Sequence, residues 1–304
     1  MSTSADLDAR AGRLATDWWF APVPAARLAV FRLLVYGFIP LDVFLLRPWG
    51  ASHGHVDPAL YQPLLLGRIL PLPTPTPELV IGVRWALAVG AVALIVLIVR
   101  DRAPRVATAV GVTLFLLYLE WMLISFSYGK VDHDRFGFLL ALAVLPTAGR
   151  AALRDATPSQ AAGWSLRMVQ VGVVATYFLA AIAKVRFGGW GWVNSTTVAR
   201  AVIRRGTALA DPLLQHPWTL QLTQWFILTI EFLSPVLLFV RPRVQQYLVA
   251  FLLGFHVMTY LMIRIIFMPH VVCLAAFLPL ERLVGIRAVP DDRRPTGSQS
   301  ARAG

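Results

Sequence analysis

The chain has 304 residues, of which 57% are hydrophobic and only 14% are charged. This is too apolar for a soluble domain of that length, and it predicts several segments that cross a lipid bilayer. A net charge of +12 would suit nucleic-acid binding, but the arginines lie in short loops between apolar segments, where membrane topology explains them better. We therefore expect no nucleic-acid partner. The single cysteine, Cys273, excludes an intramolecular disulfide and a thiolate zinc cluster.

Apolar segments follow one another along the chain and predict an all-α integral membrane protein, a bundle of about eight transmembrane helices. They cover residues 27–46, 78–99, 106–127, 136–149, 165–185, 219–240, 244–266 and 268–284. The fourth and the eighth are shorter than the ~20 residues that a spanning helix needs. The first follows an acidic leader and lacks a small-residue cleavage site, so we expect a retained helix and no signal peptide.

Three regions are expected from this pattern. Residues 1–26 form a leader, residues 27–285 form the transmembrane domain, and residues 286–304 form a disordered tail. Residues 186–218 connect the fifth and sixth segments on the outer side. Within them, 192–206 predicts an interfacial amphipathic helix with Ser195 or Thr196 as its cap.

Lysine and arginine are unevenly distributed between the two sets of connections. Sixteen lie on the side of the N-terminus and nine on the opposite side. Because cytoplasmic loops of membrane proteins carry the excess of positive charge, both termini are expected in the cytoplasm. The distribution predicts a multi-pass protein of the cell membrane.

Ionisable residues gather toward the outer ends of these segments. They are Asp42, Arg84, Glu120, Lys130, Asp132, His133, Asp134, Lys184, Arg264 and His270. An ionisable group at mid-bilayer costs roughly 2.5–3.5 kcal/mol, so such side chains are expected to face a polar cavity near the outer surface. The segment 186–218 is expected to cover this cavity. Glu231 and His256 lie nearer mid-depth and are expected to pair, while Arg32, Arg84 and Arg264 are expected to be ion-paired braces.

Lysine is rare in this chain. Of 28 basic residues only Lys130 and Lys184 are lysines, and Lys184 ends the apolar segment 165–185. One interpretation is that Lys184 reaches the lipid headgroups beside Trp190 and Trp192. The other is that it acts in the cavity, because Tyr177 shares its helical face and a desolvated amine can lose its proton near neutral pH, whereas a guanidinium cannot. His133 and His256 are then candidate partners, and His256, Tyr260 and Arg264 share one face of the seventh segment. No metal site is expected.

Four segments resemble the horizontally transferred transmembrane (HTTM) domain family, which includes vitamin K-dependent gamma-glutamyl carboxylase. They are RLAVFRLLVYGFIPLDVFLL (27–46), DHDRFGFLLALAVLP (132–146), TYFLAAIAKVRFGGWGWVN (176–194) and FHVMTYLMIRIIFMPHVVCLAAFLPL (255–280). The similarity covers nearly the whole chain in the same order.

This resemblance implies a chemistry. In the carboxylase, a lysine amine assisted by a histidine deprotonates reduced vitamin K, which reacts with O₂ to give a strongly basic alkoxide and then the epoxide. That base takes a glutamate proton, and the carbanion adds CO₂. Carried onto matching positions, Lys184 would be the base and His133 its partner. Binding of the reduced vitamin K or menaquinol would fall to His256, Tyr177, Trp190, Tyr260 and Arg264.

The resemblance leaves alternatives open. The carboxylase continues into a large lumenal region that recognises its protein substrate, whereas this chain ends after its last helix. Epoxidation is therefore favoured over protein carboxylation, and both stay open as the enzyme hypothesis. A second hypothesis is a non-catalytic membrane partner or maturation factor for an exported peptide or a thiol-redox protein. A third is a transporter, although no paired repeats of discontinuous helices are present in the sequence. Whether the chain is an enzyme stays open at this point.

Overall fold

The computed structural model describes residues 13–70 and 72–286, so much of the expected leader and nearly all of the expected disordered tail lie outside the described residues. The described helices are α2 (Ala25–Leu41), α3 (Leu65–Ile69), α4 (Pro77–Val99), α5 (Pro104–Phe126), α6 (Phe136–Val144), α7 (Gln160–Gly188), α8 (Thr197–Arg205), α9 (Pro217–Leu233), α10 (Pro242–Ile263) and α11 (Met268–Leu274). Two-residue strands, β1 (Val23–Pro24) and β2 (Pro158–Ser159), pair antiparallel.

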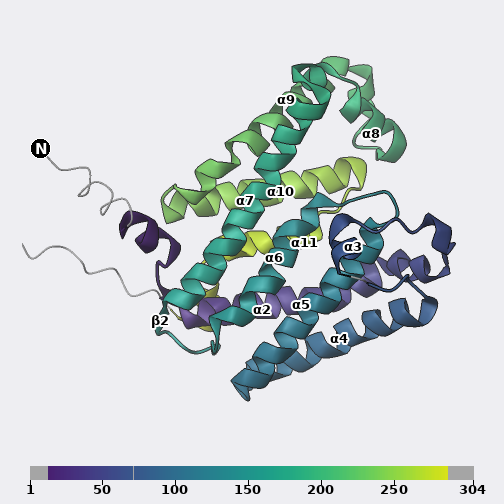
Figure 1. The fold of residues 1–304 in the computed structure, drawn as a ribbon. Coiled ribbons are helices and arrows are strands. Elements are labelled where there is room, and N and C mark those ends of the chain that lie inside the picture. Colours follow the sequence, from purple (N-terminus) through teal and green to yellow (C-terminus); the bar gives the residue numbers. More distant parts are fainter. Residues whose placement is uncertain (1–12, 71, 287–304) are drawn as a thin grey trace, which may run out of the picture.

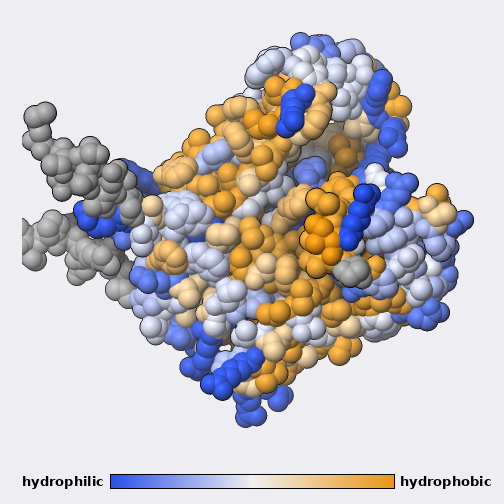
Figure 2. Space-filling view, viewed as in Figure 1, coloured by the Kyte–Doolittle hydropathy of each residue, from blue (hydrophilic) through white to orange (hydrophobic). Residues whose placement is uncertain are grey.

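Six stretches of helix are long and apolar enough to cross a membrane. They are Ala25–Leu46, Pro77–Val99, Pro104–Phe126, Gln160–Gly188, Pro217–Leu238 and Pro242–Ile263. Their outward faces carry large apolar side chains that no other part of the described chain covers, such as Val89, which is 64% exposed. Figure 2 shows hydrophobic residues over the middle of the visible face and hydrophilic residues toward its edges. The predicted all-α membrane fold is confirmed.

The fourth and eighth predicted segments are short helices in the interior of the bundle (Figure 1). α6 continues into a 3₁₀ turn at Leu145–Ala148, and α11 continues into one at Ala275–Phe277. From the rise per residue, α6 with its turn is about 22 Å long, less than the ~30 Å of a bilayer core. Longer helices surround both, so the described chain has six long helices and two short inner ones in place of eight equal spans.

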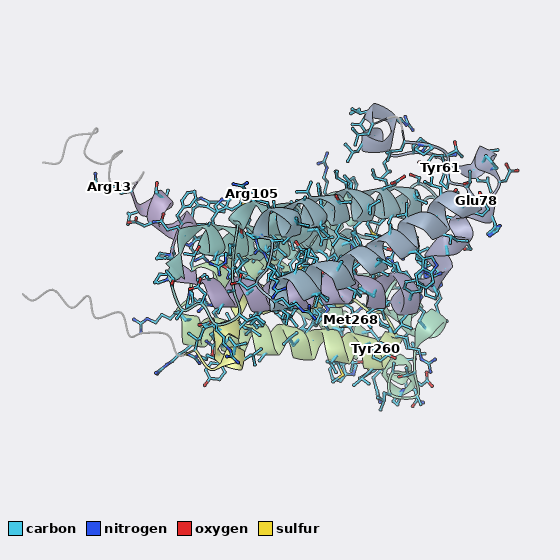
Figure 3. The ribbon with its side chains drawn as sticks, turned by 90° about the horizontal axis from the view of Figure 1, so that it is seen from below. Arg13, Tyr61, Glu78, Arg105, Tyr260 and Met268 are labelled. Atoms are coloured by element: carbon cyan, nitrogen blue, oxygen red, sulfur yellow. The ribbon has the colours of Figure 1, made fainter. Side chains whose placement is uncertain are left out.

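Side-chain contacts define two ends of the bundle. At one, which we call the Arg27 end, the Arg27 guanidinium bonds both carboxylate oxygens of Glu281 at 2.7 Å, and β1 pairs with β2. Figure 3 shows Arg13 and Arg105 at one end of the bundle and Tyr61 and Glu78 at the opposite end. We call this opposite end the Lys184 end, since α7 begins beside β1 and runs away from it to Gly188.

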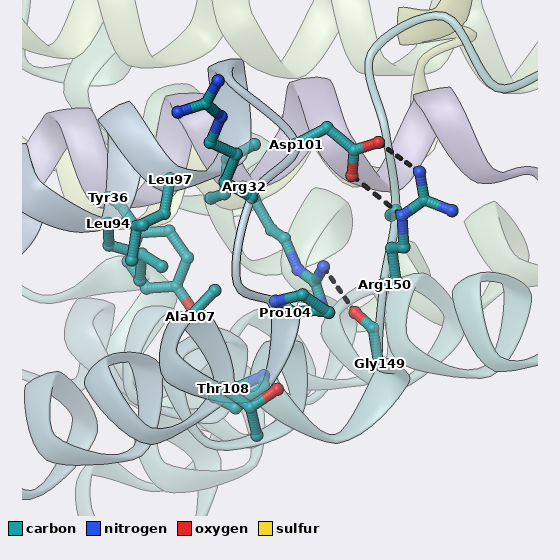
Figure 4. Close-up of a pocket in the computed structure, with 14 residues that line it drawn as sticks. Arg32, Tyr36, Leu94, Leu97, Asp101, Pro104, Ala107, Thr108, Gly149 and Arg150 are labelled. Atoms are coloured by element: carbon teal, nitrogen blue, oxygen red, sulfur yellow. Dashed lines mark hydrogen bonds and ion pairs between the residues drawn. The ribbon is translucent and has the colours of Figure 1, made fainter.

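Two of the three expected arginine braces, Arg32 and Arg84, contact other parts of the bundle, but neither forms an ion pair within the described residues. The third, Arg264, is exposed and is not such a brace. Arg32 donates from its two terminal nitrogens to Gly149 O at 2.8 Å and Leu145 O at 2.5 Å, so it caps carbonyls at the end of the α6 turn (Figure 4). The neighbouring ion pair in Figure 4 joins Asp101 to Arg150. The Arg84 guanidinium lies 4.0 Å from the centre of the Phe44 ring.

The segment after α7 differs in detail from its prediction. In place of one helix over 192–206, a 3₁₀ turn at Trp190–Asn194 precedes α8. The Ser195 hydroxyl accepts from the Thr197 amide at 3.4 Å, whereas Thr196 makes no side-chain cap. Gln224 of α9, which is 1% exposed, holds the segment in place by donating to Trp192 O and Val193 O.

Candidate functional site

The polar residues of the Lys184 end form two separate groups. In the first, the Arg135 guanidinium donates to Asp42 Oδ2 at 2.6 Å and Oδ1 at 2.8 Å, and the Tyr118 hydroxyl donates to Asp42 Oδ2 at 2.8 Å. Asp42 is 0% and Arg135 is 2% exposed. This group, which we call the Asp42 clamp, joins α5 to the end of α2 and to the turn before α6. Its charges are paired, so its role is structural.

The outer surface of the clamp carries a further ion network. Asp132 pairs with Arg47 and, at 3.0 Å, with Lys130, whose side chain is 75% exposed. Burial by itself raises the pKa of Asp132, but the hydrogen bonds and charges of Lys130 and Arg47 outweigh it and leave the pKa below its usual value. One of the two lysines is therefore a surface residue away from any cavity described below.

The second group surrounds a cavity of about 230 Å³, which we call the polar cavity. Its ionisable lining consists of His133, Asp134, Tyr177, Lys184, Glu231, His256 and His270. These residues come from the turn before α6 and from α7, α9, α10 and α11. α8 closes it with Thr197 and Ala201, in the segment that was predicted to cover such a cavity.

Lys184 forms an ion pair inside this cavity. Its Nζ lies 2.8 Å from Glu231 Oε1 and 2.6 Å from Oε2, and the two side chains are 22% and 12% exposed. The Trp192 ring centre is 5.5 Å from Nζ. The expected pair between Glu231 and His256 is wrong, because the rotation of α9 turns the carboxylate to α7. The alternative that Lys184 reaches into the headgroups is not what the geometry shows.

Two histidines of the cavity have unused hydrogen-bonding atoms. The Tyr177 hydroxyl lies 2.6 Å from His256 Nε2, and the Tyr177 ring meets the His270 ring edge-on with centroids 4.4 Å apart. His256 Nδ1 and both ring nitrogens of His270 are buried without a protein partner, and His270 is 2% exposed. Each such atom costs about 1–3 kcal/mol unless something bonds it. A polar molecule in the cavity would satisfy them.

His133 and Asp134 approach the same cavity from the turn at His133–Arg135. Asp134 is 8% exposed, and burial raises the pKa of its carboxyl although the nearby Arg135 charge acts to lower it. A carboxyl whose folded-state pKa is raised favours folding below its unfolded pKa, and this contribution is lost as the pH rises through the folded pKa.

Replacing this carboxyl gives a pH-dependent expectation. Asp134→Asn should raise the unfolding temperature above neutral pH, because it removes a poorly solvated charge. The difference from the unsubstituted protein should shrink at about pH 4, near the ordinary Asp pKa. Asp155→Asn is a control of opposite sign, because hydrogen bonds from Thr157 lower the pKa of the Asp155 carboxyl. Thermal unfolding in detergent at several pH values measures both, and a stability loss for Asp134→Asn at high pH would contradict the expectation.

Two apolar cavities adjoin the polar one. A cavity of about 670 Å³ shares His133 and Lys184 with it and is otherwise lined by residues such as Leu140 and Leu179. A cavity of about 430 Å³ shares His256 and is lined by residues such as Leu45 and Tyr260. Leu179 is 60% and Leu45 69% exposed, so both apolar cavities reach the lipid-facing surface. Residues of the polar cavity are therefore shared with two cavities that reach the lipid-facing surface.

The predicted site residues are only partly brought together. Lys184, His133, His256 and Tyr177 line the polar cavity, and Tyr260 lines an apolar one. Trp190 and Arg264, which were also predicted to bind the cofactor, line none of these cavities. Trp190 is 69% exposed, and Arg264 lies on the surface, where it ends α10 at a φ of 52°.

Among the cavity residues without a predicted catalytic or cofactor-binding role, four have a charged, imidazole or indole side chain, and two of these, Asp134 and His270, were expected to face a polar cavity. The four are Asp134, Trp192, Glu231 and His270. Glu231 and His270 carried a signal, because an ionisable residue inside an apolar segment is a functional candidate by default. No sequence signal distinguished Trp192 from Trp190, because both are tryptophans of the same short segment. Only the 3₁₀ turn at Trp190–Asn194 decides which ring faces the cavity.

One of the comparisons with known proteins finds a related family. No curated protein and no solved structure matches the chain. A family model described as the HTTM domain matches residues 139–281, which contain Tyr177, Lys184, Glu231, His256 and His270. The expected resemblance to the HTTM family is therefore confirmed over those residues.

Proposed function

We propose that this membrane protein is an enzyme that binds a quinol with an apolar tail and takes a proton from it with Lys184, in a reaction with O₂. The observation that supports this most is the composition of the polar cavity. It holds an amine, a carboxylate and buried histidine nitrogens without partners, and it adjoins apolar cavities that reach the lipid.

The lining fits a quinol such as reduced menaquinone. Its hydroxyl groups both donate and accept hydrogen bonds, and neutral imidazoles offer both a donor and an acceptor nitrogen. His270 and His256 Nδ1 are the atoms that need such a partner. A long apolar tail suits the cavity of about 670 Å³ or the one of about 430 Å³, each of which opens toward lipid. Cofactor sites are commonly apolar clefts with a few fixed polar groups.

Glu231 gives Lys184 a proton partner. A general base must be unprotonated when it acts. A proton that passes from the Lys184 ammonium to the Glu231 carboxylate leaves a neutral amine beside a neutral acid. This transfer is favoured because two charged groups are costly to keep in a poorly solvated site. The amine then accepts the quinol proton. His133 lines the same cavity and is placed to hydrogen-bond a bound hydroxyl. The neighbouring apolar side chains exclude water.

A bound quinol would supply the electrons and O₂ would be the oxidant: one oxygen atom would enter the quinol ring as an epoxide, and the other would leave as water with the two quinol hydrogens. The residues of this chain provide the base, orient the ring and keep the site dry. Carboxylation with CO₂ needs a further acceptor. The alternative is that the chain has no catalytic activity and acts as the membrane partner of an exported peptide or a redox protein. The following experiment separates this alternative from the quinol proposal.

His270 provides the test of binding. His270→Phe removes two unsatisfied nitrogens, so the ligand-free protein should be at least as stable as the unsubstituted one. Loss of a hydrogen bond to ligand should lower the amount of menaquinone that survives purification by about ten-fold. Solvent extraction and mass spectrometry measure the bound quinone, and thermal unfolding measures the stability. Tyr247→Phe, at a 77% exposed position on α10, is the control.

The two outcomes are distinct. Menaquinone that is retained by the unsubstituted protein and lost from His270→Phe supports the proposal. An absence of quinone from both proteins, combined with co-purification of an exported peptide, contradicts it and favours the partner hypothesis.

A further inference from the structure

A separate cavity of about 360 Å³ lies at the Arg27 end of the bundle. Three arginines line it, Arg27, Arg167 and Arg282, and Glu281 is its one carboxylate among the described residues. The rest of the lining is a mixture of glutamines and apolar side chains. None of these residues belongs to the polar cavity, so the proposal below is independent of the quinol chemistry.

The charges in this cavity do not cancel. Arg27 and Glu281 neutralise each other through two hydrogen bonds of 2.7 Å. The Arg167 guanidinium donates only to an uncharged group, Gln170 Oε1, at 2.8 Å, and lies 4.4 Å from the centre of the Trp18 ring. Neither Arg167 nor Arg282 has an ion pair with any described residue. Two positive charges therefore face one cavity without a counter-ion.

An apolar surface continues from the edge of this cavity. Leu238 and Val240 line the cavity. Phe239, between them, is 74% exposed, and its ring stacks on the Trp18 ring with centroids 5.9 Å apart. Val236, one turn earlier, is 50% exposed. Because these residues end the long apolar stretch Pro217–Leu238, this surface faces the bilayer at the level of its headgroups.

We propose that this cavity binds the phosphodiester headgroup of an anionic phospholipid, whose acyl chains lie along Val236 and Phe239. Guanidinium groups match phosphate oxygens with parallel hydrogen bonds, and Arg167 keeps donors free for this. Basic pockets beside membrane helices attract anionic headgroups. The adjoining apolar surface is what favours a lipid over a free phosphate ion, since a free ion would gain nothing from it.

Native mass spectrometry with defined lipids tests the proposal. The full chain is exchanged into detergent and titrated with phosphatidylglycerol or phosphatidylcholine. The unsubstituted protein should bind phosphatidylglycerol preferentially, and Arg167→Gln should weaken that binding by about ten-fold. Arg105→Gln removes the same charge from an exposed position at the same end (Figure 3) and should leave the binding unchanged. Equal weakening by both substitutions would overturn the site, because it would show a general charge effect.

Two further measurements keep the result interpretable. Arg167→Lys keeps the charge but loses the planar fork, so its binding of phosphatidylglycerol should be weaker than that of the unsubstituted protein and stronger than that of Arg167→Gln. Inorganic phosphate should raise the unfolding temperature much less than phosphatidylglycerol does. Equal stabilisation by phosphate would overturn the lipid assignment and leave a site for a free anion.

Discussion

Lys184→Arg is expected to keep the protein folded and to abolish O₂-dependent quinol turnover. A guanidinium can still pair with Glu231, as Lys184 does at 2.6–2.8 Å, so the stability should change little. It cannot give up its proton, however, and loss of a general base typically lowers the rate by about 10²–10⁴-fold. Oxygen uptake by purified protein with reduced menaquinone measures the rate. Full activity in Lys184→Arg would show that the amine is not a base.

Lys184→Met separates chemistry from stability. It leaves the Glu231 carboxylate, 12% exposed within a membrane-spanning stretch, without its partner, and removal of one member of a buried pair costs about 3–5 kcal/mol. Adding Glu231→Gln should restore much of that stability but none of the activity. Lys130 supplies the control, because it is the other lysine of the chain and its side chain is 75% exposed. Lys130→Met should change neither property.

Asp42→Asn is expected to be the most destabilising single change outside the polar cavity. It leaves the Arg135 guanidinium, 2% exposed, without the carboxylate that it bonds at 2.6 and 2.8 Å. An uncompensated charge of this kind costs about 3–5 kcal/mol. Thermal unfolding followed by circular dichroism measures the loss. Because Asp42 does not line the polar cavity, bound quinone should be retained by the fraction that stays folded.

The control for the clamp is the exposed ion pair at the other end. Asp101→Asn breaks the pair with Arg150, whose side chain is 62% exposed, and should cost far less. Replacing Asp42 and Arg135 together by leucine and methionine should recover stability relative to Asp42→Asn, since no unpaired charge is left behind. Equal losses for Asp42→Asn and Asp101→Asn would contradict the structural role of the clamp.

Much of the fold can be read from the apolar segments, and local signals account for the boundary errors. The fifth segment was predicted as 165–185, but α7 runs from Gln160 to Gly188. Ser159 caps it by accepting from the Ala162 amide at 3.2 Å, and Gly189 ends it with a φ of 66°. Both residue types are known signals for helix ends. The fourth and eighth segments were recognised as short, but α11 ends at Leu274 and not at 284. The interior position of α6 and α11 depends on how the longer helices pack.

The site was less predictable, because pairing depends on the rotation of one helix against another. Apolar context identified Lys184, His133 and His256 as candidates. The partner of Lys184 is 47 residues away on α9, and the partner of His256 is 79 residues away on α7. No sequence spacing encodes such contacts. The same limit explains why one set of ionisable residues forms two groups, the Asp42 clamp and the polar cavity.

The most direct test of Lys184-dependent quinol oxidation uses the purified protein in lipid nanodiscs with reduced menaquinone and ¹⁸O₂. Mass spectrometry of the extracted quinone then reports any epoxide oxygen. The proposal predicts labelled epoxide from the unsubstituted protein and from Lys130→Arg, but none from Lys184→Arg. An unlabelled quinone pool, recovered from unsubstituted protein that demonstrably holds menaquinone, would contradict it.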